Sequence, residues 1–407
     1  MALSRCTTLP ADVFLRDVFG HQHLHTAAEE LDPGEDAFAD LFSAQALEEM
    51  LTRGLRTSSL RLVQDGVEMP VTAVDAPGAD SPAGEAGFAD TDALRTAIAA
   101  GQTLIIRSLH RLHPPIRRFA HQLALDLGHP VGVNAFITPA HSVGVDLHFD
   151  VQDVLVLQVT GEKTWVLRTA PLPDPLPADA WFDVTSARRQ KMLDASAPLD
   201  KLAMRPGDTL YFPRGTFHAP QTGDSLSIHL TFAITKITHT DVLTSLLTPA
   251  AAADPWLRES IDPADLENDP AAARSLVAHL TQALTSAARS IDPGDLLWAV
   301  RQAAFAGPPE PSPVLPAAAP ATAYRLRDNV HYRVEQETTH CKVSAGNRSV
   351  RLPSTLGPVL QGLHDDRRLN LDDLDELVSA DTALQTVRAL VEIGVLLPLG
   401  RDGSMPA

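Results

Sequence analysis

The feature that most constrains the fold is a run of short strand-like segments between residues 103 and 235. The segments cover residues 103–109, 134–140, 154–159, 163–168, 209–213 and 225–235. Turn residues separate them, because Thr160–Gly161 predicts a hairpin turn between two strands and Pro206–Gly207–Asp208 predicts another turn. Many short strands with turns at this spacing are typical of a β-barrel or jelly roll, which is therefore the architecture we expect.

The first hundred residues predict helices and loops around this barrel. Apolar residues recur at spacings of three and four between Phe42 and Leu51, which indicates an amphipathic helix. Residues 75–91 are rich in Ala, Gly, Asp and Pro and predict a surface loop. A second helix is expected from Thr91 to about Ala100.

The chain after the barrel changes composition twice. Its first part is rich in Leu and Ala, and aspartates followed by proline (IDPADL, IDPGDLLWAV) predict two to four helix starts. A Pro- and Ala-rich stretch follows, which is typical of a linker. The predicted domains are 1–238, 239–306, the linker 307–321 and 322–407.

The last domain predicts a small mixture of strands and helices. Two strand-like segments (NVHYRVE and KVSAGNRSVRLP) are followed by two helical ones (LGPVLQGL and TALQTVRALVEIG) and a short strand, GVLLPL. This order suits a winged-helix-like module. We therefore expect an α+β protein: a jelly-roll barrel, a helical segment and a C-terminal winged-helix-like domain.

Composition narrows the partners and the compartment. No apolar run reaches the roughly 18 residues of a membrane span, and the N-terminus lacks the basic start and apolar core of a signal peptide. Only Cys6 and Cys341 are present, which favours a reducing cytoplasm. The net charge of −18 makes nucleic acid an unfavourable partner and favours basic polypeptides.

The residues with the clearest chemistry are His148, Asp150 and His218. On a strand, His148 and Asp150 are two apart, so both side chains point to one face. His218 lies within the stretch TLYFPRGTFHAP, after a strand and a turn, and is well placed to supply a third ligand. A single histidine is more often an ordinary core or surface residue, but this combination is specific. Two imidazoles and one carboxylate leave three open positions on Fe(II), which suit a bidentate 2-oxo acid and dioxygen.

The stretch that contains these residues resembles the JmjC-type cupin oxygenases, in particular the ribosomal oxygenases of bacteria and humans. The family pattern is an Asn before an apolar-Thr-Pro strand, then H-x-D, then G-x-K/R-x-W. This sequence has Asn134, Thr138–Pro139, His148–Asp150 and Gly161–Lys163–Trp165 in that order. The resemblance covers most of residues 95–235, and the order of domains after the barrel is also similar.

The resemblance implies a set of cofactor-binding residues. In this family a basic residue at the position of Lys163 binds the distal carboxylate of 2-oxoglutarate, and an ammonium inside a narrow barrel suits a dicarboxylate. Thr231 and Asn134 are expected to add hydrogen bonds to the cosubstrate, and His229 is expected near the barrel interior. Each of these three residues could equally serve only in packing, and Lys163 could be a solvated turn lysine.

The function that the resemblance implies is Fe(II)- and 2-oxoglutarate-dependent hydroxylation of a side chain in a protein or peptide, with release of succinate and CO2. The substrate class is a ribosomal protein or a ribosomally made peptide precursor. A homodimer is expected through residues 239–306, as in the family, but the Leu residues of this segment (Leu243, Leu246–Leu247 and Leu296–Leu297) could equally close the bottom of the barrel. The alternative is a non-catalytic cupin or peptide-binding protein with a winged-helix-like docking module. A metal cupin without 2-oxoglutarate would leave Lys163 unexplained.

Other features carry weaker expectations. Asp146 and the irregular segment 170–200 depart from the family pattern near the expected mouth of the barrel, so Asp146 either faces substrate or lies in solvent. His21, His23 and His25 are expected to be surface histidines. Three aromatic side chains are expected in the core or the pocket wall: Trp165, Tyr211 and Phe212.

Overall fold

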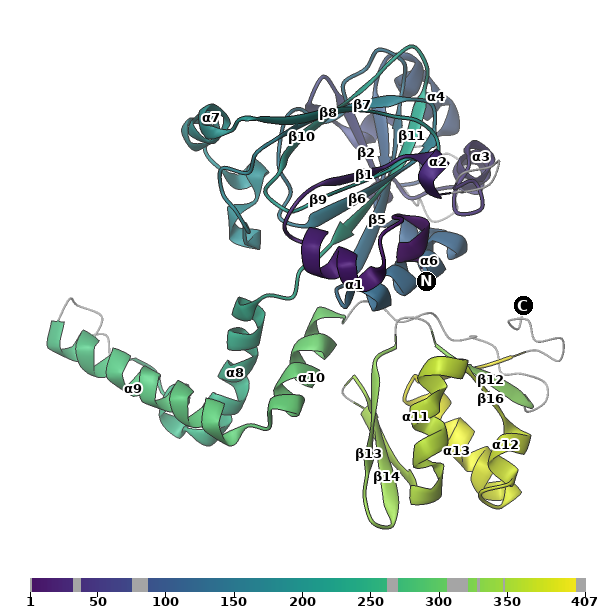
Figure 1. The fold of residues 1–407 in the computed structure, drawn as a ribbon, viewed down its shortest axis with the longest axis vertical. Coiled ribbons are helices and arrows are strands. Elements are labelled where there is room, and N and C mark those ends of the chain that lie inside the picture. Colours follow the sequence, from purple (N-terminus) through teal and green to yellow (C-terminus); the bar gives the residue numbers. More distant parts are fainter. Residues whose placement is uncertain are drawn as a thin grey trace. The chain divides into compact units, whose positions relative to one another are not determined.

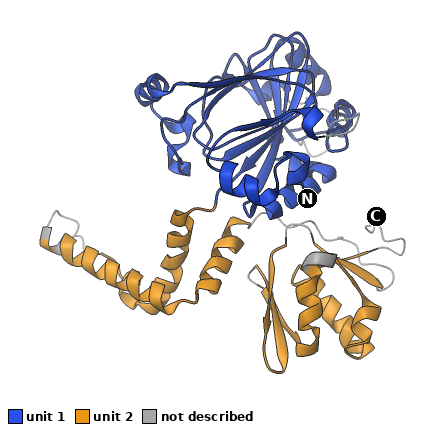
Figure 2. Ribbon diagram, viewed as in Figure 1, with its two compact units in different colours: residues 1–236 blue, residues 237–407 orange. Residues whose placement is uncertain are grey.

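The computed structural model divides the chain into two compact units, residues 1–236 and 237–407 (Figure 2). The residues that it describes are 2–31, 38–74, 87–261, 270–305, 321–327, 330–346 and 348–399. The domain boundaries predicted from the sequence stay predictions. The predicted linker at 307–321 and most of the predicted loop at 75–91 fall outside the described residues.

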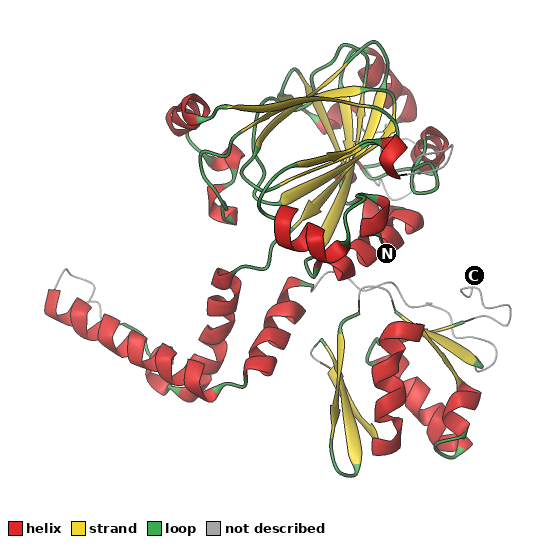
Figure 3. Ribbon diagram, in the orientation of Figure 1, coloured by secondary structure: helices red, strands yellow, loops and turns green. Residues whose placement is uncertain are grey.

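The first unit contains a large antiparallel sheet of eight strands in the order β1-β9-β6-β11-β5-β4-β2-β3 (Figures 1 and 3). Its strands are β1 (Leu24–Thr26), β2 (Leu60–Gln64), β3 (Val67–Met69), β4 (Thr103–Ile106), β5 (Val131–Thr138), β6 (Asp153–Thr160), β9 (Thr209–Phe212) and β11 (Ser227–Ile234). Sequence neighbours are often separated in this order, so the site is built from distant parts of the chain.

A smaller antiparallel sheet of three strands faces the central part of the large one. Its order is β10-β7-β8, with β10 at Phe217–Thr222, β7 at Lys163–Arg168 and β8 at Pro198–Met204. Apolar side chains of both sheets form one buried cluster, which includes Val156 and Leu210 from the large sheet and Trp165 and Met204 from the small one. The expected α+β class with an antiparallel barrel is therefore confirmed.

Helices cover the outer face of the large sheet. The helix α6 (Pro114–Leu127) was not predicted, yet its sequence has Pro at the first position and Gly128 in the left-handed conformation at its end. Phe119 on this helix packs edge-on against Phe232 of β11, with ring centroids 5.4 Å apart. Coverage on both faces explains why seven of the eight residues of β6 are buried.

The predicted hairpin at Thr160–Gly161 is wrong. The strands on either side of it, β6 and β7, belong to different sheets, so the turn carries the chain from one sheet to the other. Gly161 has φ +63°, and a Cβ there would lie 2.1 Å from the carbonyl oxygen of Leu226. Glycine is therefore required by the close approach of this turn to a neighbouring loop.

The other predicted elements of this unit differ mainly at their ends. The helix predicted near Phe42–Leu51 is α3 (Ala44–Thr52), and the one predicted from Thr91 is α4 (Thr91–Ala99). The strand predicted at 103–109 ends at Ile106, and the short helix α5 (Leu109–Leu112) follows it. The irregular segment 170–200 contains one helix of some length, α7 (Ser186–Ala195).

The second unit begins with three helices in its described residues, within the predicted number. They are α8 (His239–Ala253), α9 (Pro270–Ser290) and α10 (Pro293–Ala304). The side chain of Asp292 caps α10 by accepting a hydrogen bond from the backbone N–H of Asp295. No helix in the described parts of the chain is long and apolar enough to span a membrane.

The rest of the second unit is a small α+β body with its own buried core. Its two three-stranded sheets contain β12 (Ala323–Leu326), β16 (Arg368–Asn370) and β17 (Leu396–Pro398), and β13 (Tyr332–Gln336), β14 (His340–Ala345) and β15 (Arg348–Pro353). The helices are α11 (Gly357–Asp366), α12 (Leu371–Asp375) and α13 (Ala380–Glu392). The predicted strands and helices are therefore present in the predicted order.

Candidate metal centre

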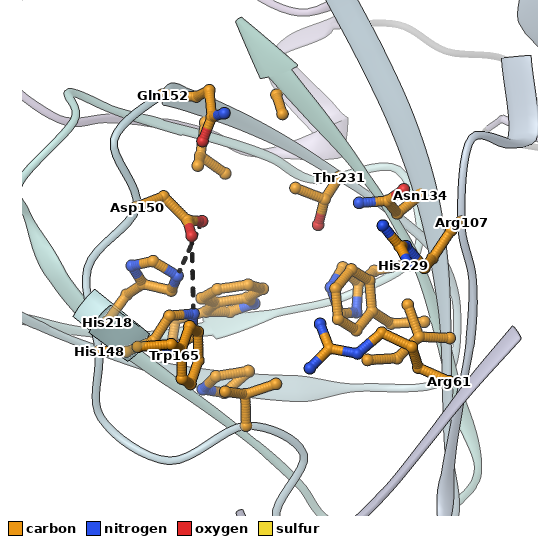
Figure 4. Close-up of a pocket in the computed structure, with 17 residues that line it drawn as sticks. Arg61, Arg107, Asn134, His148, Asp150, Gln152, Trp165, His218, His229 and Thr231 are labelled. Carbon is orange, nitrogen blue, oxygen red and sulfur yellow. Dashed lines mark ion pairs between the residues drawn. The ribbon is translucent and has the colours of Figure 1, made fainter. Parts of the chain in front are cut away.

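The side chains of His148, Asp150 and His218 lie together in the first unit, with one potential ligand atom from each within 4.8 Å of the others. The Nε2 atom of His148 is 4.0 Å from one carboxylate oxygen of Asp150, and Nε2 of His218 is 3.6 Å from the other. Figure 4 shows both imidazoles turned toward the carboxylate. The three residues are the only such group of potential metal ligands in the described parts of the chain.

Backbone pairing brings the two histidines together. His148 and His218 donate backbone hydrogen bonds to each other's carbonyl oxygen, at 3.2 and 2.8 Å, and form an isolated β-bridge. Two expectations need correction here. His148 and Asp150 lie in an extended segment before β6 and not within a regular strand, and His218 is the second residue of its own strand, β10. The carbonyl oxygen of Asp150 accepts from the backbone N–H of Gly215 at 2.9 Å, which ties this segment to the turn before β10.

In both histidines, the Nδ1 atom of the imidazole lies within hydrogen-bonding distance of a backbone carbonyl oxygen. Nδ1 of His148 is 2.7 Å from the carbonyl oxygen of Asp146, and Nδ1 of His218 is 3.1 Å from that of Thr216. A proton on Nδ1 donates to these carbonyls, which leaves the lone pair of each Nε2 facing Asp150. Burial and the neighbouring His148 together lower the pKa of His218 to about 4, so this imidazole is neutral at pH 7.

Trp165 forms the wall beside the three residues. Its side chain is 2% exposed and lines the pocket, and its ring lies 6.1 Å from that of His218 between centroids. Its indole Nε1 is buried and has no hydrogen-bond partner among the described residues. Because a buried donor without a partner costs free energy, this N–H is a ready site for a ligand acceptor in the pocket. Tyr211 and Phe212 are buried, as expected, and the ring centroid of Phe212 is 4.7 Å from that of His218.

Lys163 is buried at the inner end of the barrel, 1% exposed. Its Nζ donates to Oγ1 of Thr138 at 2.9 Å and to Nδ1 of His229 at 3.1 Å. Burial lowers the pKa of Lys163 to about 7. The ring of His229 stacks on that of Phe136 at a centroid distance of 4.7 Å, and both rings line the pocket. Lys163 itself does not line the pocket, because His229 lies between its ammonium group and the pocket. The sequence did not indicate this arrangement.

Asn134 and Thr231 are directly paired on the neighbouring strands β5 and β11, and both line the pocket. Oδ1 of Asn134 accepts from the backbone N–H of Ser108 at 3.0 Å, so its amide NH2 is left for the pocket. These two residues add one amide donor and one hydroxyl close to His229. The predicted cofactor-binding residues are thus gathered at one end of the barrel.

The pocket has a volume of about 230 Å³. Sequence reasoning missed several of its lining residues, including Arg61, Arg107, Gln152 and Phe182. The two arginines come from β2 and from the residue after β4, which precede the H-x-D motif by many residues. No motif marks them, and only the register of the sheet reveals that they reach the pocket.

Among the other residues named from the sequence, two histidines lie apart from the site, whereas Asp146 touches it only through its backbone carbonyl. His23 is 3.1 Å from a carboxylate oxygen of Asp200, and His25 is 3.4 Å from one of Asp208, so these histidines are half-buried and paired rather than simply on the surface. Asp146 is exposed and packs against Gly66, where a Cβ would meet its carboxyl group at 2.2 Å.

Comparison with known families supports the resemblance found in the motifs. Residues 111–242 match the family described as the JmjC domain. Ribosomal oxygenase 2 of Bos taurus is 32% identical over 170 residues, which are 38% of this chain and 34% of the relative. The bifunctional lysine-specific demethylase and histidyl-hydroxylase NO66 of Drosophila grimshawi is 37% identical over 105 residues, 26% of this chain and 14% of the relative. The chain thus matches about a third or less of the length of these relatives.

Solved structures share the fold over nearly the whole chain. The ribosomal oxygenase YcfD from Escherichia coli, in complex with cobalt and 2-oxoglutarate, aligns with a TM-score of 0.56 and 15% identity. The alignment covers 96% of this chain and 98% of YcfD. Another structure of Escherichia coli YcfD aligns with a TM-score of 0.57 and 16% identity. At this level of identity the likeness establishes the fold alone.

Proposed function

We propose that this chain is an Fe(II)- and 2-oxoglutarate-dependent oxygenase that hydroxylates a side chain of a protein or peptide, with release of succinate and CO2. The observation that carries the proposal is the cluster of His148, Asp150 and His218 on the wall of a pocket, within the residues that match the JmjC domain family. The other pocket residues support it, because donors for a carboxylate gather at the inner end of the barrel.

The three side chains fit a divalent iron. The two imidazoles turn Nε2 toward Asp150, whose carboxylate is the third potential ligand. This donor set holds one face of the metal and leaves positions open for other ligands. Bound iron supplies the oxidative chemistry that couples decarboxylation of 2-oxoglutarate to hydroxylation.

The chain's own residues orient the cosubstrate. Lys163 is the proposed partner of its distal carboxylate, and the amide of Asn134 and the hydroxyl of Thr231 are proposed to donate to the same ligand. Lys163 is now bonded to Thr138 and His229, so its Nζ must turn toward the pocket when a carboxylate arrives. The carboxylate then raises the pKa of the lysine and holds the ammonium form.

The wall near Lys163 is partly apolar. Phe136 and Trp165 line the pocket there, and the ring of His229 stacks on Phe136 and is hydrogen-bonded to Lys163. Hydrogen bonds and charge pairs are stronger in such a low-dielectric space than in water.

The proposed substrate is a polypeptide, either a ribosomal protein or a ribosomally made peptide precursor. The names of the relatives, ribosomal oxygenase and histidyl-hydroxylase, support a protein substrate. The net charge of −18 favours a basic polypeptide over nucleic acid. A cytoplasmic location would be consistent with the use of only two cysteines.

The second unit is proposed to serve assembly or docking. The helical segment 239–306 exposes large apolar side chains, including Leu243 at 56%, Leu247 at 50% and Leu297 at 55%, and we propose that it forms a homodimer. The small α+β body at 322–407 is proposed to be a winged-helix-like module that supports the dimer or docks an extended peptide.

The first experiment is an anaerobic titration of the purified protein with Fe(II) and then 2-oxoglutarate, which follows the visible charge-transfer band of the complex. The wild type is expected to develop the band, His218→Ala to lose it, and Lys163→Ala to need more 2-oxoglutarate. Absence of the band in the wild type would contradict the oxygenase proposal. It would favour the alternative, a non-catalytic cupin or peptide-binding protein.

A further inference from the structure

Two arginines form part of the pocket wall away from the candidate metal ligands. Arg61 lies in β2 and Arg107 directly follows β4, and both line the pocket. Figure 4 shows their side chains on the opposite side of the pocket from Asp150. We call these two residues the arginine wall. Nothing in the proposed handling of iron or 2-oxoglutarate uses them.

The register of the large sheet fixes where the arginine wall stands. Arg61 pairs with Ile105, Ile105 with Phe136, and Phe136 with His229. Directly paired residues of an antiparallel sheet point to the same face, so these four side chains form one row. Because neighbouring strands lie about 4.8 Å apart, Arg61 begins about 14 Å from His229 along this row. Arg107 lies two residues beyond Ile105 and shares the same face.

The arginine wall carries more positive charge than its surroundings neutralise. Arg61 donates from Nε and Nη2 to both carboxylate oxygens of Glu68, at 3.0 and 2.7 Å. Arg107 is exposed, and its guanidinium donates no hydrogen bond within the described residues. The hydrogen bond from Arg61 and the positive charges of both arginines lower the pKa of Glu68, so the two arginines share one carboxylate. Asp150 is the one acidic side chain that the described residues contribute to the pocket lining, and it belongs to the proposed metal centre. One positive charge is thus left over in a protein whose net charge is −18.

We propose that the arginine wall binds an acidic side chain of the substrate polypeptide, an aspartate or glutamate close to the residue that is hydroxylated. This inference rests on the proposed function and specifies its substrate class. A cosubstrate that reaches from the metal centre to Lys163 fills the inner end of the pocket, so the arginine wall remains for the polypeptide. Arginine suits the role because its planar fork matches both oxygens of a carboxylate.

The spacing limits where the acidic residue stands. An extended polypeptide advances about 3.3 Å per residue, so about 14 Å along the row corresponds to about four residues. A basic polypeptide with one acidic residue near its modified side chain satisfies both the overall charge and the arginine wall. Glu68 competes with that residue for the guanidinium groups, because it already holds Arg61.

The test uses two capped tripeptides that differ in one group, glycine-glutamate-glycine and glycine-glutamine-glycine. Binding of each to the full-length protein is measured by saturation-transfer difference NMR, which requires neither metal nor turnover. The glutamate peptide is expected to bind about fivefold more tightly than the glutamine peptide, the size of a partly exposed arginine–carboxylate pair. Equal binding of the two peptides would overturn the proposal.

Three variants identify the residues responsible. Arg107→Gln is expected to remove the preference for glutamate. Glu68→Gln is expected to increase it, because Arg61 is released from its internal partner. The control Arg53→Gln, whose side chain is 79% exposed and does not line the pocket, should change nothing. A preference that survives Arg107→Gln, or that falls in Glu68→Gln, would overturn the proposal.

The same variants separate this inference from the proposed function. The charge-transfer band with Fe(II) and 2-oxoglutarate should form in Arg107→Gln as in the wild type. A normal band without a glutamate preference would refute the arginine wall alone. A glutamate preference without a band in the wild type would refute the oxygenase proposal, and the arginine wall would then be an anion site of a binding protein.

Discussion

The two ends of the pocket differ in how firmly the fold holds their side chains. At the inner end, Trp165, Lys163 and His229 are 2%, 1% and 1% exposed, and each packs against or bonds to neighbours from both sheets. At the outer end, Phe182 is 57% exposed, and Arg107 is exposed with a guanidinium that donates no hydrogen bond within the described residues. The candidate metal ligands lie beside Phe182 and across the pocket from Arg107 (Figure 4). The buried inner end therefore suits one ligand of fixed shape. Side chains at the exposed outer end can bind different partners, or change, without lowering the stability of the core.

The largest effect is expected from removal of the carboxylate that the proposed metal centre needs. Asp150→Ala is expected to reduce Mn(II) affinity by more than the roughly 100-fold typical of lost supporting contacts, because a direct ligand and its charge disappear. Calorimetry with Mn(II) measures the change. The control is Asp146→Asn, since only the backbone of Asp146 contacts His148. Wild-type affinity in Asp150→Ala would show that the metal centre lies elsewhere.

The inner end should not tolerate loss of its largest side chain. Trp165→Ala empties space between the two sheets and is expected to lower the free energy of unfolding by about 3–5 kcal/mol. Urea unfolding followed by circular dichroism measures the effect. Trp165→Phe keeps most of the ring but removes the unpartnered Nε1–H, so it should unfold nearly like the wild type and bind 2-oxoglutarate more weakly. Unchanged 2-oxoglutarate binding in Trp165→Phe would exclude a role for that N–H.

The inner end should also make cosubstrate binding depend on pH. Burial lowers the pKa of Lys163 to about 7 in the empty pocket, whereas the proposed complex needs the ammonium form. Above pH 7 the free protein must therefore take up a proton when it binds 2-oxoglutarate. Affinity should fall about tenfold for each pH unit between 7.5 and 9.5 and level off below pH 7.

Matched lysine variants test the source of this dependence. Lys163→Met keeps the length of the side chain without the charge, so 2-oxoglutarate should bind weakly at every pH and the slope should disappear. Lys201→Met, at an exposed position of β8, should keep both the affinity and the slope of the wild type. A slope that persists in Lys163→Met would assign the titration to another group.

The same contrast explains what the sequence could predict. The candidate metal ligands and the inner-end residues could be predicted from the sequence, because H-x-D, G-x-K-x-W and the strand patterns are local signals. Even there, local patterns could not show that His229 lies over Lys163, because that contact depends on the pairing of β11 with β5 and the packing of β7 against them. The hairpin predicted at Thr160–Gly161 was wrong for a similar reason, because a turn sequence does not show whether the strand after the turn pairs with the strand before it.

The outer end could not be predicted at all. Arg61 reaches the pocket only because β2 and β4 extend the large sheet beyond the barrel strands, so that Arg61 pairs with Ile105. Arginines in strands are usually solvated, and no spacing rule distinguishes this one. Contacts set by the order of strands in a sheet need the tertiary structure, whereas contacts set by spacing along one strand do not.

The smallest effect is expected from a substitution at the exposed end of the pocket. Phe182 and Trp165 are both aromatic residues on the pocket wall, but the ring of Phe182 lies at the surface, 5.8 Å from that of His148 between centroids. Phe182→Ala should therefore change the free energy of unfolding by less than about 0.5 kcal/mol and leave Mn(II) affinity unchanged. Urea unfolding and calorimetry measure both. A loss as large as that expected for Trp165→Ala would mean that the outer end is part of the core, and the division of the pocket into a fixed and a variable end would fail.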